Sequence, residues 1–524
     1  MKRRDFCKGL AVTFAAGTLA PAAALPQAGA ATALVGRAVP DDYYTLWYRS
    51  DRCGADLRHD YYYSDSLFDH PATEYDNQLA LATLGMAAAA DCTWESDQRY
   101  WMEGEVGRAD HIRDAFAKLG FTEVQLFNYT HSLNDTPDTV GCAVARKTLV
   151  RGGRQVTIIG AFLRGSGYGA EWSGNLHAGP GSAHVGFVTA ARQLVEKIRA
   201  YVQVSAKRQP LGTLKLWMGG YSRGGGVANL VAARLPAVLP QLEKKNTFVY
   251  TFAAPASLTA ADCPDLQQDY DNNHAADGSL KKNWGTSNIF NIVSSGDVIP
   301  RILPAEWGFY RNGNDRFLPS TVIPEELQAL NDRSAGMEGT PMDFGRLAVS
   351  EETDAVLRSM LDLFCDRQTY YKGYEDAMRC MLQCATTRTE EEVTRGIVRD
   401  DAAVVAQLRS MELMQRFPQE KVERCVQAAS ALSRPVLEKL GSAVPLQAQQ
   451  IVIPMLAVGL CFELQPETVQ LVADFVLSTI TVKGQLSGIL KTVLCHFQEN
   501  YITVLEAYDP ADHGMTPYTR REEL

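Results

Sequence analysis

Residues 214–235 read LKLWMGGYSRGGGVANLVAARL and predict a strand, a sharp turn and a helix in immediate succession. The apolar run at 214–218 is typical of a buried strand, and residues 224–235 have the pattern of a helix. Between them, residues 220–224 form the pattern G-x-S-x-G. A serine in such a turn stands clear of the sheet, and the next amide lies at the helix start, where it can donate to an oxyanion. We therefore predict that Ser222 is a nucleophile.

Strands and helices alternate around this turn. β-Branched and apolar runs predict three further buried strands, at residues 156–163, 247–252 and 289–293. Helices are predicted at residues 79–90, 109–119 and 184–202. Alternation of this kind favours a mostly parallel sheet covered by helices on both faces. Together with a nucleophile turn at the end of a strand, it indicates an α/β-hydrolase fold.

A nucleophilic serine needs a base and an acid that orients the base. In folds of this class the chain order is serine, acid, histidine. Asp297 lies just beyond the strand predicted at 289–293, where the acid is expected. Only His496 and His513 follow it in the chain. We favour His496 as the base, because a helix-patterned stretch follows it, whereas His513 lies in a polar C-terminal tail.

The residues between Asp297 and His496 have a different composition from the rest of the chain. Residues 325–490 are rich in Glu, Leu, Ala, Gln and Val and carry few strand signals, so we expect a helical block. Because Asp297 and His496 lie on either side of it, the block is predicted to be an insertion, or cap, in one hydrolase domain. That domain would consist of residues 31–324 and 491–524.

The first thirty residues predict an export signal. A basic start (MKRRDFCK), a short apolar stretch and a small-residue end at Ala28-Gly29-Ala30 have the order of a cleavable signal peptide. Arg3-Arg4-Asp5-Phe6 resembles a twin-arginine signal, with an ordinary secretory signal as the alternative. We therefore expect a protein exported across the bacterial inner membrane to the periplasm, the cell surface or the medium.

Composition excludes several classes of protein. Of the 524 residues, 46% are hydrophobic and 21% are charged, which excludes a disordered, collagen-like or polytopic membrane chain. The net charge of −10, without a long basic run, disfavours nucleic acid as a partner. Cys380 and Cys384 lie one helical turn apart, but no histidine or second cysteine pair is near in sequence. We predict buried helical thiols there, and neither a metal nor a cofactor.

Several motifs together resemble those of the class 3 lipases, the fungal-type triacylglycerol lipases, and especially their bacterial relatives. The matching pieces are FLRGS at 162–166, HVGF at 184–187, GYSRGG at 220–225 and YTFAAP at 250–255. They are similar to that family's F-R-G-[ST], H-x-G-F, G-H-S-L-G-G and Y-T-F-G-x-P. The resemblance covers roughly residues 60–310 and a C-terminal piece, and it implies hydrolysis of carboxylic esters, above all those of lipids.

The resemblance also implies a role for each matching residue. Ser222 is expected to be the nucleophile, Asp297 the orienting acid and His496 the base. The amide of Arg223 and Ser166 are expected to form the oxyanion hole. The segment H-x-x-E-x-Y that begins at His496 is similar to the bacterial relatives.

The chain also departs from the family pattern. His513 fits the fungal D-H-x-x-Y better than His496 does. Tyr221 stands where the family has histidine, and Arg223 stands where it has leucine. A charge at Arg223 would favour a polar or anionic substrate, or else pair with an acid on the helix. In the family a mobile lid follows the position of Ser166, and here residues 167–181 contain five glycines, which suit a moving segment or a static loop.

Three functions of different classes follow from these patterns. The first is a secreted serine hydrolase that cleaves lipid or small acyl esters. The second is an acyltransferase or amidase that uses the same three residues, and the third is a non-catalytic surface-binding protein with a hydrolase fold. The complete set of serine, acid and histidine favours an enzyme. Because loss of the basic signal makes the chain more acidic, any transient contact with lipid is expected to use an apolar face, for example on the cap.

Overall fold

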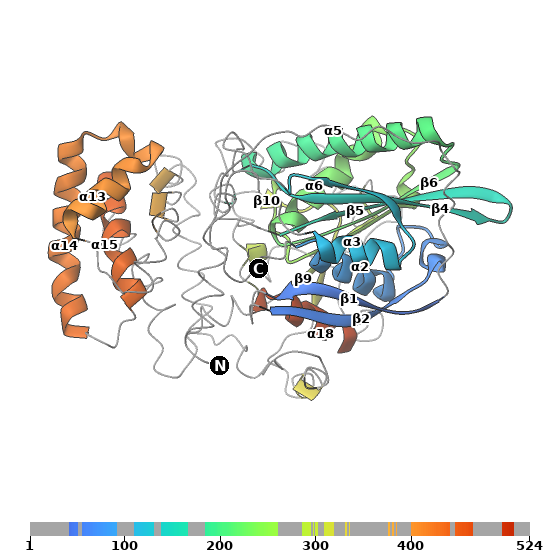
Figure 1. Ribbon diagram of the computed structural model, residues 1–524, viewed down its shortest axis with the longest axis horizontal. Coiled ribbons are helices and arrows are strands. Elements are labelled where there is room, and N and C mark those ends of the chain that lie inside the picture. Colours follow the sequence, from blue (N-terminus) through green and yellow to red (C-terminus); the bar gives the residue numbers. More distant parts are fainter. Residues whose placement is uncertain are drawn as a thin grey trace, which may run out of the picture.

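The computed structural model describes residues 41–50, 55–91, 109–129, 138–165, 184–259, 286–294, 299–301, 309–318, 400–440, 446–464 and 495–507, with isolated positions that include Asn175, Asp297, Cys380 and Cys384. Residues 1–30, Ser166, the glycine-rich stretch 167–181 apart from Asn175, and His513 lie outside the described residues. A sheet with its helices forms one end of the molecule, and a group of helices forms the other (Figure 1).

A seven-stranded sheet of order β11-β9-β7-β6-β5-β4-β3 forms the centre of the fold. From β5 to β11 all neighbours are parallel, whereas β3, β4 and β5 pair antiparallel. The strands are β3 (Thr122–Phe127), β4 (Cys142–Arg151), β5 (Arg154–Leu163), β6 (Thr213–Tyr221), β7 (Thr247–Phe252), β9 (Ile289–Ser294) and β11 (Asn314–Leu318). The four predicted strands are β5, β6, β7 and β9. The predicted α/β-hydrolase fold with its mostly parallel sheet is confirmed.

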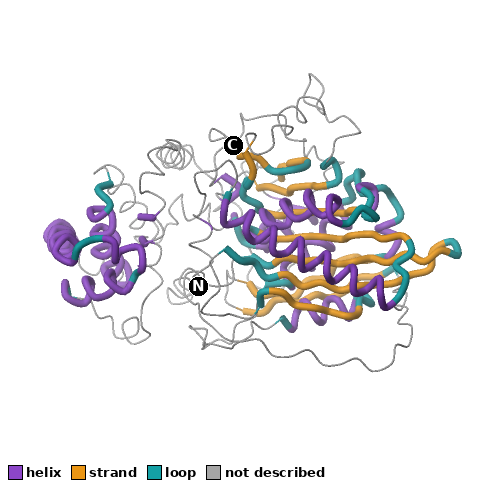
Figure 2. The backbone as a smooth tube through the Cα atoms, turned by 90° about the horizontal axis from the view of Figure 1, so that it is seen from above, coloured by secondary structure: helices purple, strands orange, loops and turns teal. Residues whose placement is uncertain are grey.

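Each face of the sheet carries its own apolar core. Because side chains alternate along a strand, Leu214, Leu216 and Met218 of β6 pack under α5 (Val185–Arg208) and α6 (Arg223–Val238), while Trp217 points to the other face. Seen from above, α5 and α6 lie along the strands (Figure 2). The two helices are those predicted at 184–202 and 224–235.

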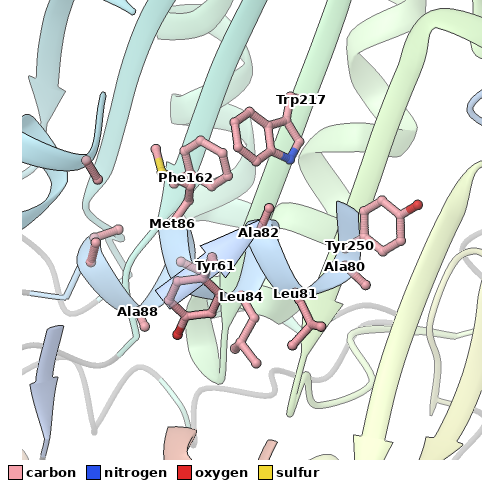
Figure 3. Close-up of a cluster of buried hydrophobic side chains, with 14 of the residues drawn as sticks. Tyr61, Ala80, Leu81, Ala82, Leu84, Met86, Ala88, Phe162, Trp217 and Tyr250 are labelled. Atoms are coloured by element: carbon pink, nitrogen blue, oxygen red, sulfur yellow. The ribbon is translucent and has the colours of Figure 1, made fainter. Parts of the chain in front are cut away.

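The opposite face carries α2 (Asn77–Ala89), α3 (Asp110–Lys118), the hairpin of β1 (Asp42–Ser50) with β2 (Ala55–Tyr63), and α18 (Gln498–Ala507). In Figure 3, Trp217 and Phe162 of the sheet lie beside the alanine-rich helix α2. Trp217 Nε1 donates to Thr83 Oγ1 of α2 at 2.7 Å, so the buried indole has a partner. The small side chains of α2 let it lie close to the sheet and carry the chain toward the end of β5.

The described part of residues 325–490 is helical. It contains α13 (Asp401–Ser410), α14 (Gln419–Leu440) and α15 (Leu446–Cys461), whose apolar faces share one cluster that also reaches Ala256 and Phe309. Cys380 and Cys384 are buried in that cluster, so the prediction of buried thiols is confirmed. The domain boundaries stay predictions.

Short elements complete the described chain. They are β8 (Leu258–Thr259), β10 (Phe309–Tyr310), and the 3₁₀ turns Asp65–Phe68, Lys244–Asn246, Ile299–Arg301 and Glu412–Arg416. Among the described residues, none of the helices combines the length and the apolar character that a membrane crossing requires. In the same part of the chain, no three His, Cys, Asp or Glu side chains come together in a way that could hold a metal ion.

Candidate active site

Ser222 occupies a strained turn between β6 and α6. Its φ of 54° and ψ of −126° lie in a region that side-chain-bearing residues rarely adopt. Backbone bonds fix this conformation, since Ser222 N donates to Phe252 O at 2.9 Å and Gly226 N donates to Ser222 O at 3.1 Å. The turn therefore presents the hydroxyl at the carboxyl end of β6.

The two glycines of the motif let neighbouring backbones approach this turn. A Cβ on Gly220 would lie 2.4 Å from Gly224 O. A Cβ on Gly224 would lie 2.3 Å from Arg164 O and 2.5 Å from Leu163 O, at the end of β5. Close contact with backbone at both positions explains why each must be glycine.

His496 lies just before α18 and reaches the serine. Its Nε2 is 2.9 Å from Ser222 Oγ, and its Nδ1 is 2.8 Å from Asp297 Oδ2. Because a carboxylate only accepts, Nδ1 carries the proton and Nε2 is left to accept from the hydroxyl. The three residues singled out from the sequence thus come together, although Ser222 and His496 are 274 positions apart.

Asp297 is fully buried and receives three donors. Besides His496, Tyr501 of α18 donates its hydroxyl to Oδ2 at 2.7 Å, and Ile299 N donates to Oδ1 at 2.9 Å. Tyr501 Oη in turn accepts from Ser294 N at 3.1 Å. Burial, and then the charge of Asp297, raise the pKa of Tyr501 well above its ordinary value, so the phenol stays a donor.

Tyr221, which departs from the family pattern, has a structural role here. Its hydroxyl donates to the backbone oxygen of His496, and its ring lies edge-on to Tyr501. Burial raises its pKa well above the usual value, so this donor also keeps its proton. Tyr221, which directly precedes Ser222, therefore holds the segment that carries His496.

Asp91, two positions after the end of α2, is a site residue that the sequence did not indicate. Its Oδ1 accepts from Gly165 N at 2.7 Å, and its Oδ2 accepts from Gln498 Nε2. Gly165 directly precedes Ser166, and Gln498 is two positions after His496. Asp91 thus joins the end of β5 to the first turn of α18. No local motif marks it, because its partners come from distant parts of the chain.

Of the two residues predicted to form the oxyanion hole, the structure describes Arg223. Arg223 is the first residue of α6, directly after the serine, as the prediction requires. Ser166 lies outside the described residues, one position beyond Gly165. Its role, and that of residues 167–181 as a lid, stay predictions.

Comparison with known families decides the affiliation of this region. Residues 165–307, which include Ser222 and Asp297, match the family described as lipase (class 3). This part of the chain is therefore similar to the class 3 lipases. The match supports a lipase-type hydrolase and confirms the family that the sequence motifs indicated. His496 lies outside the matched residues.

Solved structures of fungal lipases resemble the chain over about half its length. The Rhizomucor miehei lipase propeptide complex is 20% identical over 47% of this chain and 69% of that one, with a TM-score of 0.32. The lipase from Rhizopus microsporus var. chinensis is 17% identical over 47% and 75%, with a TM-score of 0.30. Lipase II from Rhizopus niveus is 16% identical over 46% and 80%, with a TM-score of 0.29. A comparison with curated proteins found no match.

Proposed function

We propose that this protein hydrolyses carboxylic esters of lipids, with Ser222 as nucleophile, His496 as general base and Asp297 as orienting acid. The observation that carries the proposal is the position of the imidazole, 2.9 Å from Ser222 Oγ and 2.8 Å from Asp297 Oδ2. Both distances are those of hydrogen bonds between a nucleophile, its base and the acid that orients it. The family match supports a lipid ester as the substrate.

In the first half of the reaction, Ser222 Oγ attacks the ester carbonyl while His496 Nε2 takes its proton. Asp297 stabilises the imidazolium that forms. The tetrahedral intermediate collapses when His496 gives the proton to the leaving alcohol, and an acyl-serine remains. Water, activated by the same imidazole, then adds to the acyl carbonyl and releases the carboxylic acid.

The developing oxyanion is stabilised at the start of α6. The Arg223 amide belongs to the first turn of that helix, where backbone N–H groups point outward and the helix dipole favours negative charge. Ser166 would supply the second donor, as the family resemblance implies. Such donors act mainly on the transition state, so they raise kcat more than they tighten substrate binding.

The place of action is also part of the proposal. The basic start, apolar stretch and small-residue end of residues 1–30 support export across the bacterial inner membrane. On this proposal, lipid is met outside the cytoplasm through an apolar surface rather than through positive charge, since the whole chain carries a net charge of −10.

The proposal is tested by labelling and turnover with the purified mature protein. A fluorophosphonate should label the wild type and leave Ser222→Ala unlabelled. Against a series of p-nitrophenyl esters, His496→Ala should lose about 10⁴-fold or more in kcat, as removal of a triad member does. The matched control His513→Ala should keep wild-type turnover. Equal labelling of Ser222→Ala, or loss of activity in His513→Ala alone, would refute the assignment. Preferential transfer to an added alcohol would make the enzyme an acyltransferase.

A further inference from the structure

The side chain of Arg223 is buried beside the nucleophile. The residue is 1% exposed, and its guanidinium lies over the ring of Phe187 at 5.3 Å from the centroid. An arginine that bound an anionic substrate would present its charge to the substrate pocket. Here the charge is instead covered by the start of α5, so its role has to be sought in its protein partners.

Among the described residues, the guanidinium donates to oxygen atoms from two separate parts of the chain. Arg223 Nε and Nη2 both donate to the backbone oxygen of Thr139, at 3.2 and 3.1 Å. Nη1 donates to Asn175 Oδ1 at 2.6 Å. Thr139 precedes β4, and Asn175 belongs to the connection between β5 and α5. The Arg223 side chain therefore bonds the first turn of α6 to two connecting segments, one before the start of β4 and one after the end of β5.

Asn175 is held a second time, by His184. His184 Nε2 is 2.8 Å from Asn175 O, and Nδ1 accepts from Phe187 N at 3.2 Å as the N-cap of α5. Because Nδ1 accepts, Nε2 carries the proton and donates to Asn175 O. The imidazole also stacks on Phe187, with ring centroids 4.0 Å apart. Phe187 thus has His184 stacked on its ring and Arg223 over it, and both hold Asn175.

We propose that Arg223 acts as a positioning residue, whose guanidinium fixes the first turn of α6, and with it the Arg223 amide, through Thr139 and Asn175. The inference rests on the proposed function, in which that amide stabilises the oxyanion. The leucine that the family pattern has here cannot donate to either oxygen. The bonds hold a transition-state donor, so their loss should lower kcat and leave KM nearly unchanged.

The test compares Arg223→Met, Asn175→Leu and the double variant in the purified mature protein. The readouts are kcat and KM for a neutral p-nitrophenyl ester and for one with a carboxylate on its acyl chain, at a temperature well below the Tm of each variant. Arg223→Met should lose about tenfold to a hundredfold in kcat, less than deletion of an oxyanion donor costs. Its KM should stay within about twofold of wild type for both esters.

Asn175→Leu should lower kcat in the same direction by a smaller factor. The double variant should be no slower than Arg223→Met alone, because both substitutions remove one shared interaction. Arg234→Met is the matched control on the same helix, since Arg234 donates within α6 to Leu230 O. It should retain wild-type kcat. If Arg223→Met does not fold, the Asn175→Leu variant tests the proposal by itself. A wild-type kcat in that variant would overturn the proposal.

Two results would point elsewhere. A wild-type kcat in Arg223→Met with only a lower Tm would make the side chain merely structural. A raised KM for the anionic ester alone would make it a substrate-binding group. Both results overturn the positioning role while Ser222→Ala stays inactive, so they differ from failure of the proposed function, in which Ser222→Ala would remain active.

Discussion

At the scale of single residues, the position of His496 depends on two tyrosine hydroxyl groups, which do not belong to the serine, acid and histidine pattern. Tyr501 donates to Asp297, and Tyr221 donates to the backbone of His496. The acid thus has a donor on α18, the helix that begins just after His496. Rotation of the Asp297 carboxyl group, or of the His496 imidazole, would break more than one hydrogen bond. The orientation of the imidazole is therefore fixed from its backbone and from its Nδ1.

Tyr501→Phe should weaken this support. The change removes one hydrogen bond to a buried carboxylate and leaves Ser294 N without its acceptor, which costs about 1.5–3 kcal/mol for a bond to a charged group. We expect a lower free energy of unfolding in urea and a kcat for a p-nitrophenyl ester that is lower by about tenfold to a hundredfold, the factors to which this range of free energy corresponds. Tyr201→Phe is the control, because its hydroxyl donates to Glu123 O away from the site. An unchanged kcat in Tyr501→Phe would show that Asp297 needs no help from the phenol.

At the scale of elements, the candidate active site lies where the ends of β5, β6 and β9 meet the starts of α6 and α18. The separation between β5 and α6 is set by Gly224, which leaves no room for a side chain. The opposite face is held by polar contacts between the hairpin and α18. Ser50 donates to Glu499, and His59 Nε2 is 2.6 Å from Glu506 Oε1. The histidine segment is therefore anchored by the sheet on one side and by the hairpin on the other.

Gly224→Ala should be strongly destabilising. The new methyl group would meet two backbone oxygens at 2.3 and 2.5 Å, and neither can move without displacing β5 or α6. Overpacking against backbone should cost about 3 kcal/mol, the upper end of the usual range, in chemical unfolding. Gly165→Ala is the matched substitution, since the nearest atom to its Cβ would be Asp91 Oδ1 at 3.4 Å, an ordinary contact. Equal losses in the two variants would mean that this close approach does not control stability.

At the scale of the whole molecule, the sequence predicted the parallel half of the sheet better than its antiparallel edge. Buried parallel strands such as β7 are continuous apolar runs, which are easy to recognise. The strand β4 was not predicted, because Arg146 and Lys147 interrupt its apolar pattern. Both side chains are nevertheless buried. Lys147 Nζ is paired with Asp65 at 2.6 Å and donates to Leu119 O, contacts that no local pattern predicts.

The candidate site divides in the same way. Ser222 and Asp297 follow strand ends and His496 precedes a helix, so motif and chain order were enough to single out three side chains that lie within hydrogen-bond distance. The residues that support them could not be found by that route. Asp91 and Tyr501 have ordinary local contexts, and their partners lie far away in the chain. The sequence showed Arg223 as a departure from the family pattern, but it did not indicate its partners Thr139 and Asn175.

The buried phenols predict how the whole fold responds to alkali. Burial is the largest cause that raises the pKa of Tyr61, Tyr63, Tyr221, Tyr250 and Tyr501 above the ordinary value. In the unfolded chain these groups ionise near pH ~10. A group whose pKa is raised by folding stabilises the fold below its unfolded pKa and loses that contribution as pH rises toward the folded value.

The Tm should therefore change little as pH rises toward about 9 and fall steeply above about 10, where the unfolded state releases protons that the folded state retains. Absorbance at 295 nm checks the cause, because phenolate from the buried tyrosines should appear together with loss of near-ultraviolet circular dichroism. If all the tyrosines ionised before the circular dichroism signal changed, the buried phenols would not be the groups that limit stability in alkali.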